Sequence, residues 1–349
     1  MIKTLAIETS CDDTSIGIIS FDGDHFSVDQ LLAYSQVPDH QKYGGVMPEI
    51  ASRLHSEKIL GVLHAVGWGE IENVDTISVT THPGLPGSLV VGKAVGATLA
   101  KRYNKPLYEV NHIYGHIFSL LLERNKTDIE FPMVVLTASG GHNDLYFITE
   151  DQNKFHIEHL GKTLDDAAGE CFDKVSRMLG GPYPGGVWIG EMAQKHKTKL
   201  LEYVECNKCD ILDNAVSFKR IFLAKESFDF SFSGMKSQVS ILLKNFEQQN
   251  IALTEDLICE IAYEFQESVV EVLAKKLARA GLKYGAKTLG ISGGVSANDR
   301  LWEYANGLIK HKNYINLNFS LVKPTKKIYS TDNAAMIGVV GILQQEHML

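Results

Sequence analysis

The chain has 349 residues, of which 44% are hydrophobic and 22% charged, and its formal net charge is −8. This length allows two lobes, each with its own hydrophobic core, and the composition is that of a globular protein. The acidic balance disfavours binding of nucleic acid by bulk electrostatics, so such a substrate would need a local basic surface or a partner. No stretch is apolar enough to cross a membrane and the N-terminus does not resemble a signal peptide, so we expect a cytoplasmic protein.

The five cysteines are scattered along the chain and do not form a disulfide framework, which agrees with a reducing compartment. Cys206 and Cys209 form a single C-x-x-C pair. A zinc site would need a second pair of ligands and a redox site a strand-to-helix junction, and the sequence supplies neither.

The first predicted elements form a hairpin. Apolar strands over residues 4–8 and 16–20 flank a polar turn. Residues 133–137 and 145–148 repeat this design around a turn that contains glycine. Two hairpins of one design, about one lobe apart, predict a duplicated architecture.

Helices and strands alternate over much of the remaining chain. In chain order we expect a helix over 49–66, a strand over 76–79, a helix over 88–100, a strand over 106–110 and a long helix capped by Thr254. A strand over 287–292 then runs into residues 293–298, which open a helix, and a final helix covers 333–345. Apolar residues recur at helical spacing between Ile258 and Leu273, so this stripe should face the core. Such alternation predicts α/β lobes with mixed sheets.

Three glycine-containing turns, two of them at the ends of predicted strands, are candidates for binding an anion. They cover residues 139–142, 183–186 and 292–294. Glycine lets backbone amides approach a phosphate closely. Each turn taken alone is better explained as a tight turn, but the three together favour a phosphate or nucleotide cleft. None is a Walker loop or a G-x-G-x-x-G fingerprint.

His112 and His116 lie four residues apart, so on one helix face they could share a metal ion. Two surface or capping histidines are the alternative explanation of this spacing. A zinc protease of the H-E-x-x-H type has a glutamate after the first histidine, and here that residue is Ile113, so proteolysis is excluded. A third ligand must come from elsewhere. Asp332, at the predicted start of the last helix, is either that ligand or an N-cap.

The segment 163–174 is dense in acidic residues for a stretch with so much alanine and glycine. Its carboxylates could reach a ribose or a metal-bound water. They could equally form a charged first helical turn that offsets the macrodipole.

Taken together, these segments closely resemble the TsaD family, the bacterial members of the universal Kae/Gcp/OSGEP group. The matching segments are residues 7–14, 44–53, 83–85, 111–116, 139–142, 165–170, 172–174, 183–186, 230–236, 292–295 and 330–336. The resemblance implies an α/β, actin-like (ASKHA, sugar-kinase-type) fold of two duplicated lobes, with nucleotide and metal in the cleft between them. We expect residues 1–110 plus about 325–349 in the N-terminal lobe, and residues 111–324, with helical insertions, in the C-terminal lobe.

The resemblance also implies an activity. It is the transfer of the threonylcarbamoyl group from threonylcarbamoyl-AMP to N6 of adenosine 37 in tRNAs that read ANN codons, which forms t6A and releases AMP. By this inference one divalent metal ion, Fe²⁺ or else Zn²⁺, is held by His112, His116 and Asp332, and Asp12 and His142 lie near the reacting centre. The implied donor-binding residues are Thr137, Ala138, Ser139, Gly140, Gly141, Asp173, Gly186 and Asn298. The chain departs from the usual family pattern at His82, Tyr114, Cys171, Ser330 and the pair Asn143 and Asp144, none of which is an implied ligand.

The implied partners are tRNA as substrate, a TsaB-like paralogous subunit, a TsaE-like ATPase and a TsaC-type synthase that supplies the intermediate; no membrane is expected. We expect helix 49–66 and its neighbour 88–100 to form the dimer face. Two other functions stay open. One is a small-molecule kinase of the actin-like superfamily, which the paired histidines disfavour because imidazole suits a softer metal than magnesium. The other is a scaffold that binds nucleotide without catalysis.

Overall fold

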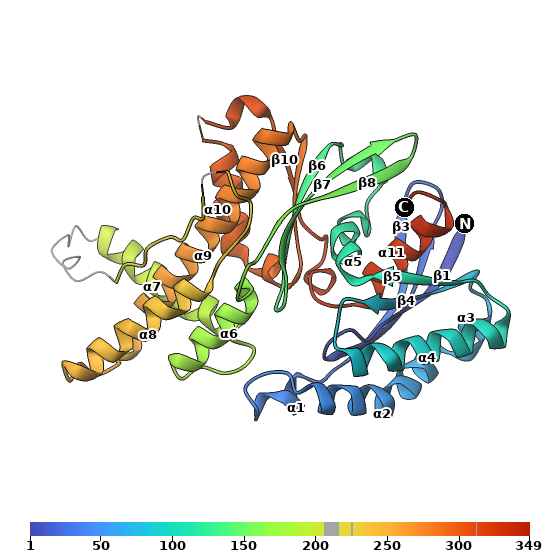
Figure 1. Ribbon diagram of the computed structural model, residues 1–349, viewed down its shortest axis with the longest axis horizontal. Helices are drawn as coiled ribbons and strands as arrows, with labels where there is room; N and C mark the ends of the chain where they lie inside the picture. Colours follow the sequence, from blue (N-terminus) through green and yellow to red (C-terminus); the bar gives the residue numbers. More distant parts are fainter. Residues whose placement is uncertain (206–215, 225, 312) are drawn as a thin grey trace.

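Two mixed sheets organise the molecule (Figure 1). The structure is a computed structural model and describes residues 1–205, 216–224, 226–311 and 313–349. Each sheet has five strands, in the orders β3-β2-β1-β4-β5 and β8-β7-β6-β9-β10. In both, the central strand pairs antiparallel with the strand that follows it and parallel with a later one. This repeat of one topology confirms the predicted duplication. Cys206 and Cys209 lie outside the described residues.

The strands have the following bounds. The first sheet contains β1 (Ile2–Glu8), β2 (Asp13–Phe21), β3 (Phe26–Ser35), β4 (Thr76–His82) and β5 (Leu107–Asn111). The second contains β6 (Met133–Ala138), β7 (Asn143–Asp151), β8 (Lys154–Lys162), β9 (Thr288–Ser292) and β10 (Ser320–Val322).

The helices cover the sheets and fill the space between them. They are α1 (Val37–Gln41), α2 (Pro48–Val66), α3 (Trp68–Glu72), α4 (Pro86–Tyr103), α5 (His112–Phe118), α6 (Ala168–Met178), α7 (Gly185–Glu205), α8 (Ser233–Gln248), α9 (Glu255–Tyr284), α10 (Asp299–Ile309) and α11 (Ala334–Gln345). Helices α2 and α4 lie on one face of the first sheet, α5 and α11 lie between the sheets, and the remaining long helices gather beyond the second sheet (Figure 1).

Alternating side chains of the central strands explain this layering. Along β1, Leu5 and Ile7 pack towards α2, whereas Ala6 packs into the core that α11 shares with the second sheet. Successive side chains of a strand point to opposite faces, so one short apolar strand serves two cores. The C-terminal helix thereby returns to the first sheet, where both chain ends lie (Figure 1).

The predicted hairpins, long helix and final helix are all present, with Thr254 capping α9 as expected. The segment expected to open a helix after β9 forms a 3₁₀ turn, Gly294–Ala297, and Asn298 then caps α10. Gly293 has φ +83°, and a Cβ there would meet the carbonyl of Ala138. Only glycine therefore fits at the start of this turn. The predicted division of the chain into lobes at residues 110 and 325 stays a prediction. No helix of the described residues is long and apolar enough to span a membrane.

Candidate functional site

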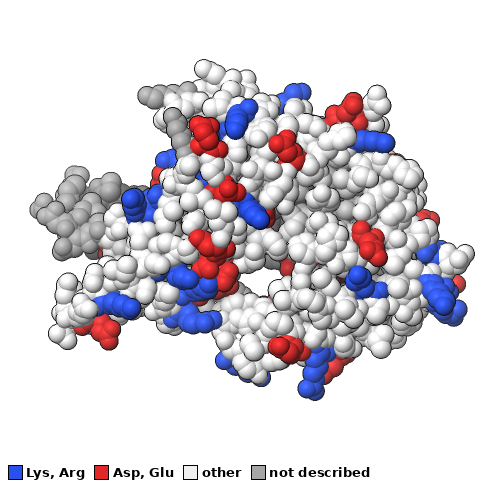
Figure 2. All heavy atoms as spheres, in the orientation of Figure 1, with Lys and Arg blue, Asp and Glu red and all other residues white. Residues whose placement is uncertain are grey.

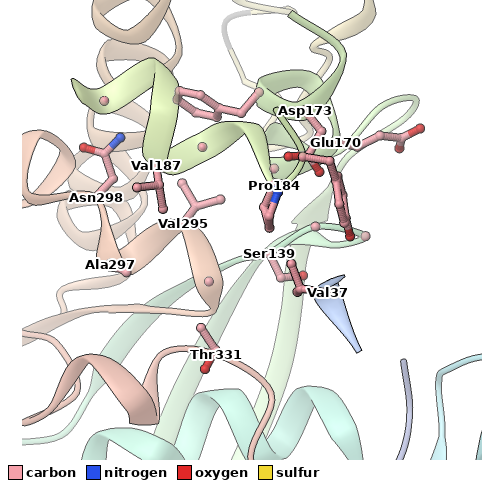
Figure 3. Close-up of a pocket in the computed structure, with 18 of the residues that line it drawn as sticks. Val37, Ser139, Glu170, Asp173, Pro184, Val187, Val295, Ala297, Asn298 and Thr331 are labelled. Atoms are coloured by element: carbon pink, nitrogen blue, oxygen red, sulfur yellow. The ribbon is translucent and has the colours of Figure 1, made fainter. Parts of the chain in front are cut away.

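A cleft of about 1620 Å³ opens between the two sheets and is lined by the hairpin turns of both. The turn of the first hairpin contributes Ser10, Cys11, Asp12 and Asp13, and the turn of the second contributes residues 139–142. Sites for one small molecule typically have about 300–1,000 Å³, so this cleft has room for a nucleotide together with part of a second substrate. Figure 3 shows the side of the cleft formed by α6, α7 and the segment before α10.

Two histidines and one aspartate form a compact cluster at the cleft. The ligand atoms of His112, His116 and Asp332 all lie within 4.8 Å of one another, and Asp332 Oδ1 is 3.2 Å from His116 Nε2. Both histidines lie on α5, which starts directly after β5 because Asn111 caps it. The N-cap of α11 is Asn333, whose side chain accepts from the Met336 amide. Asp332 is therefore not the cap, which removes the alternative explanation of this residue.

The cluster fits a divalent metal ion. His116 is 1% exposed, its Nδ1 has no hydrogen-bond partner, and its Nε2 contacts Asp332 without the geometry of a hydrogen bond, which is costly for a buried imidazole without a ligand. Burial opposes charge on His112, but Asp332 and Glu8 outweigh it and raise the His112 pKa to about 9. Burial would also raise the Asp332 pKa, yet His112 and His116 hold it well below its usual range. Two imidazoles and a carboxylate suit Zn²⁺ or Fe²⁺.

Glu8 is a residue of this site that the sequence analysis missed. It is fully buried at the end of β1, accepts a hydrogen bond from Thr80 Oγ1 at 2.5 Å and from the Ser10 amide, and lies 3.1 Å from His112 Nδ1. A carboxylate on the second ring nitrogen fixes the tautomer and orientation of a metal-binding histidine. An acidic residue at the end of an apolar strand was the signal in the sequence.

Two carboxyl groups from the first turn face the cleft. Burial is the main cause of a raised pKa at both Asp12 and Asp13, and it raises the Asp13 pKa to about 7. Asp13 Oδ1 has no hydrogen-bond partner. Burial lowers the pKa of His142, which lines the cleft from the second turn, so its imidazole is neutral at pH 7. Asp13 was not among the predicted site residues.

The second turn presents glycine backbone to the cleft. A Cβ added to Gly140 or Gly141 would meet no atom within 4 Å, so the space beside their amides is open to a ligand. The Ser139 hydroxyl accepts from the His142 amide at 3.1 Å and so helps to shape the turn. Thr137 and Ala138 are buried in β6, behind the turn, and do not line the cleft.

The other predicted donor-binding residues lie deeper along the cleft. Asp173, Gly186 and Asn298 all line it, and Figure 3 shows Asp173 and Asn298 on opposite sides, with the apolar side chains of Val187 and Val295 between them. Burial raises the Asp173 pKa to about 6, although its carboxylate accepts from the Gly185 amide at 2.6 Å. Asn298 caps α10 and donates to Gln266 Oε1 at 3.0 Å.

The acidic segment before α6 has a role that neither interpretation of the sequence foresaw. Asp165 accepts from the amides of Phe232 and Ser233 at 2.8 and 3.1 Å, so it caps the start of α8. Asp166 pairs with Lys174 and Lys236, each at 2.8 Å. These two carboxylates join α6 to α8, and only later residues of the segment, such as Asp173, reach the cleft.

Two sheets of one topology, with a metal-suited cluster in the cleft between them, define an α/β protein of the actin-like class, as predicted. The TsaD family profile, described as tRNA N6-adenosine threonylcarbamoyltransferase, matches residues 30–339. A protein of that name from Staphylococcus aureus (strain Newman) is 40% identical over 343 residues, which is 97% of this chain and 91% of that protein. One from Kosmotoga olearia is 40% identical over 342 residues, covering 97% and 92%. The chain belongs to the family of tRNA N6-adenosine threonylcarbamoyltransferases.

Solved structures agree on the fold. HypF from T. kodakarensis superposes with a TM-score of 0.55 at 14% identity, and full-length HypF in its phosphate- and nucleotide-bound form with 0.56 at 11%. Both matches cover 99% of this chain, which spans about half of those proteins, 48% and 56%. The likeness shows a shared fold alone.

Family membership confirms the predicted transferase function and leaves the small-molecule kinase less supported.

Proposed function

We propose that this chain transfers the threonylcarbamoyl group of threonylcarbamoyl-AMP to N6 of adenosine 37 in tRNAs that read ANN codons, and releases AMP. Family membership supports the reaction. One observation carries the assignment of residues: the metal-suited cluster and the open glycine turn line the same cleft, so a polarised carbonyl and an adjacent phosphate can be held side by side.

The metal site in this proposal consists of His112, His116 and Asp332, with Glu8 orienting His112. The donor set suits both Fe²⁺ and Zn²⁺. We assign Fe²⁺ first and Zn²⁺ second. When bound, the ion would act as a Lewis acid on the carbonyl oxygen of the group to be transferred.

The donor would lie along the cleft from the glycine turn to α10. The amides of Ser139, Gly140 and Gly141 would face its phosphate, since successive amides form an anion-binding concavity. Asp173, Gly186 and Asn298 would hold its adenosine, whose ring would lie against Val187 and Val295. Thr137 and Ala138, which are buried behind the turn, would act only by fixing its position.

The acceptor amine is a weak nucleophile because its lone pair is delocalised into the adenine ring, so positioning must supply much of the rate. N6 forms a bond to the carbonyl carbon, the bond from that carbon to the phosphate oxygen breaks, and AMP leaves with the electron pair. In our proposal Asp12 orients N6 and accepts the proton it loses. His142, as a neutral imidazole, would hydrogen-bond the group in transfer.

The proposed partner surface lies on α2 and α4. Small and apolar side chains are exposed along these helices, among them Leu60 (62% exposed) and Val90 (63%). Apolar side chains exposed on a helix pair are typical of protein–protein contacts. We propose that a TsaB-like subunit docks here, with a TsaE-like ATPase and a TsaC-type synthase completing a cytoplasmic system.

The surface charge supports a need for such helpers in tRNA binding. Figure 2 shows Lys and Arg side chains interspersed with Asp and Glu. Of the basic groups near the cleft, Lys195 and Lys197 pair with Glu255 and Glu303 at 2.7 and 3.1 Å. Lys327 pairs with Asp299 at 3.1 Å. Neutralised lysines attract a phosphate backbone weakly, so an assembly would provide the rest of the basic surface.

A reconstituted transfer assay tests the proposal. The purified chain is incubated with a TsaC-type synthase, threonine, bicarbonate, ATP and unmodified tRNA, with and without the helper proteins, and the nucleosides are analysed by mass spectrometry. We expect modified adenosine with the helpers, and its loss in His112→Ala. No modification under any condition, together with ATP turnover on a small alcohol, would establish the kinase instead.

A further inference from the structure

A second cavity lies on the far side of the C-terminal lobe, against the last third of α9. It has a volume of about 470 Å³, within the range of small-ligand sites. Gln266 of α9 lines the main cleft, whereas Lys276 lines this cavity ten residues further along the helix, which is about 15 Å at 1.5 Å per residue. The two sites are therefore separate. We call this cavity the basic pocket, and its polar and aromatic lining is Phe222, Lys275, Lys276, Arg279, His311, Asn313 and Tyr314.

The charge of the basic pocket is one-sided. Lys275, Lys276 and Arg279 lie within about one turn of α9, and no carboxylate is among the described residues that line the cavity. Glu271, one turn earlier, pairs with Lys275 at 2.5 Å and with Arg220 at 3.0 Å. Within the described parts of the chain no acidic group lies within ion-pair distance of Lys276 or Arg279.

Lys276 and Arg279 are held in place by backbone. Lys276, which is 1% exposed, donates to the carbonyls of Ser227 and Asp229, and Arg279 donates to the same Ser227 carbonyl. A guanidinium carries five N–H donors, so this contact leaves Arg279 with further donors for a ligand. Burial, and next the charge of Arg279, lower the Lys276 pKa to about 8, with Asp229 acting in the opposite direction. Two neighbouring cations without a counter-charge would be stabilised by an anion.

Aromatic side chains complete the pocket. Lys275 Nζ lies 5.9 Å from the ring centroid of Phe222, which is 40% exposed, and Tyr314 lines the cavity from the segment after α10. A cationic wall beside two aromatic rings suits a ligand that carries both phosphate and a flat ring. The restriction of the cations to about one turn of helix favours a small ligand over a stretch of RNA.

We propose that the basic pocket binds a mononucleotide-class ligand, with its phosphate on Lys275, Lys276 and Arg279 and its ring against Phe222 and Tyr314. This site would act independently of the transfer reaction, and its existence does not depend on the proposed function.

Calorimetric titration of AMP into the full-length, metal-loaded chain tests the proposal. We expect two binding events, one in the cleft and one in the basic pocket. The double substitution Lys275→Gln and Arg279→Gln should weaken the second event at least tenfold and leave the first unchanged. Asn298→Ala should do the reverse. Lys283→Gln, on the same helix but outside the pocket lining, is the matched control and should leave both events unchanged.

A second variant protects the test against misfolding. His311 is an exposed residue on the rim, and His311→Glu places a negative charge there without altering α9, so it should also weaken the second event. A single event that Asn298→Ala abolishes, or two events unaffected by both pocket variants, would overturn the proposal. Loss of tRNA binding in these variants with unchanged AMP binding would overturn it too, and would assign the pocket to an RNA backbone.

Discussion

The two hairpin turns occupy the same place in the two copies of the sheet but differ in chemistry. The β1–β2 turn ends a strand with buried Glu8 and presents Asp12 and Asp13 to the cleft, so it is rich in carboxyl groups. The β6–β7 turn presents Gly140 and Gly141, with open space beside their amides, so it accommodates an anion. Both turns line one cleft, and in our proposal one of them serves the metal and the acceptor amine and the other the donor phosphate.

The comparison explains why neither lobe would suffice. Carboxylates raise the affinity of His112 for a proton or a cation, but they would repel a phosphate placed beside them. Glycine amides attract a phosphate but provide no base. A group transfer between a phosphorylated donor and an amine needs both environments within reach of one carbonyl.

The largest effect should come from the metal cluster beside the first turn. His112→Ala should lower the transfer rate about a thousandfold, because polarisation of the carbonyl contributes several kcal/mol and each 1.36 kcal/mol is a factor of ten. Bound metal per chain, measured by elemental analysis after dialysis, should fall with it. His156→Ala, at an exposed position of β8 away from the cleft and from α2 and α4, is the control. Full activity in His112→Ala would remove the metal from the mechanism.

Glu8→Gln should have the next largest effect. The amide keeps the shape but loses the charge that holds His112 Nδ1, and loss of such partners typically weakens metal binding about 10- to 100-fold. Competition with a chromogenic chelator measures this affinity without any substrate. Glu57→Gln, exposed on α2, should bind metal as the unmodified chain does. Equal affinity in Glu8→Gln and Glu57→Gln would show that Glu8 serves folding alone.

Gly141→Ala tests the second turn. No atom lies within 4 Å of the added methyl group, so the melting temperature should stay the same while the methyl group occupies space needed by the donor phosphate. We expect the KM for the donor to rise about tenfold, which corresponds to about 1.4 kcal/mol. Gly307→Ala, equally free of contacts but on α10 away from the cleft, should leave KM unchanged.

The last of these predictions concerns the pH dependence of stability and not activity. Asp173 has a pKa of about 6 in the folded chain against an ordinary value of 3.8, so between these values the folded state binds more protons than the unfolded one. Its contribution to the free energy of unfolding therefore falls as the pH rises from about 4 to 6. Asp173→Asn should gain stability relative to the unmodified chain across this window, by up to about 3 kcal/mol. Urea unfolding at pH 4.5 and 7 measures the difference, and equal differences at both would contradict the burial argument.

Much of this architecture could be predicted because its signals are local. Apolar strands, the spacing of His112 and His116, and the cap at Thr254 can be recognised from a few adjacent residues. Glu8 and Asp165 were misjudged for the opposite reason. Glu8 meets His112 across 104 positions and Asp165 caps a helix 67 positions away, and such pairings depend on packing of the two sheets and of α6 on α8. The residue types alone do not specify them.

The most direct test of the division between the turns is single-turnover transfer at varied donor concentration in Asp12→Asn and Gly141→Ala. Asp12→Asn should lower the maximal rate about a hundredfold and leave the half-saturating donor concentration unchanged, because general base catalysis typically contributes about 10²–10⁴-fold. Gly141→Ala should raise the half-saturating concentration and leave the maximal rate unchanged. Full transfer activity in Asp12→Asn, or the same parameter changed in both variants, would contradict the assignment of the amine to one turn and the phosphate to the other.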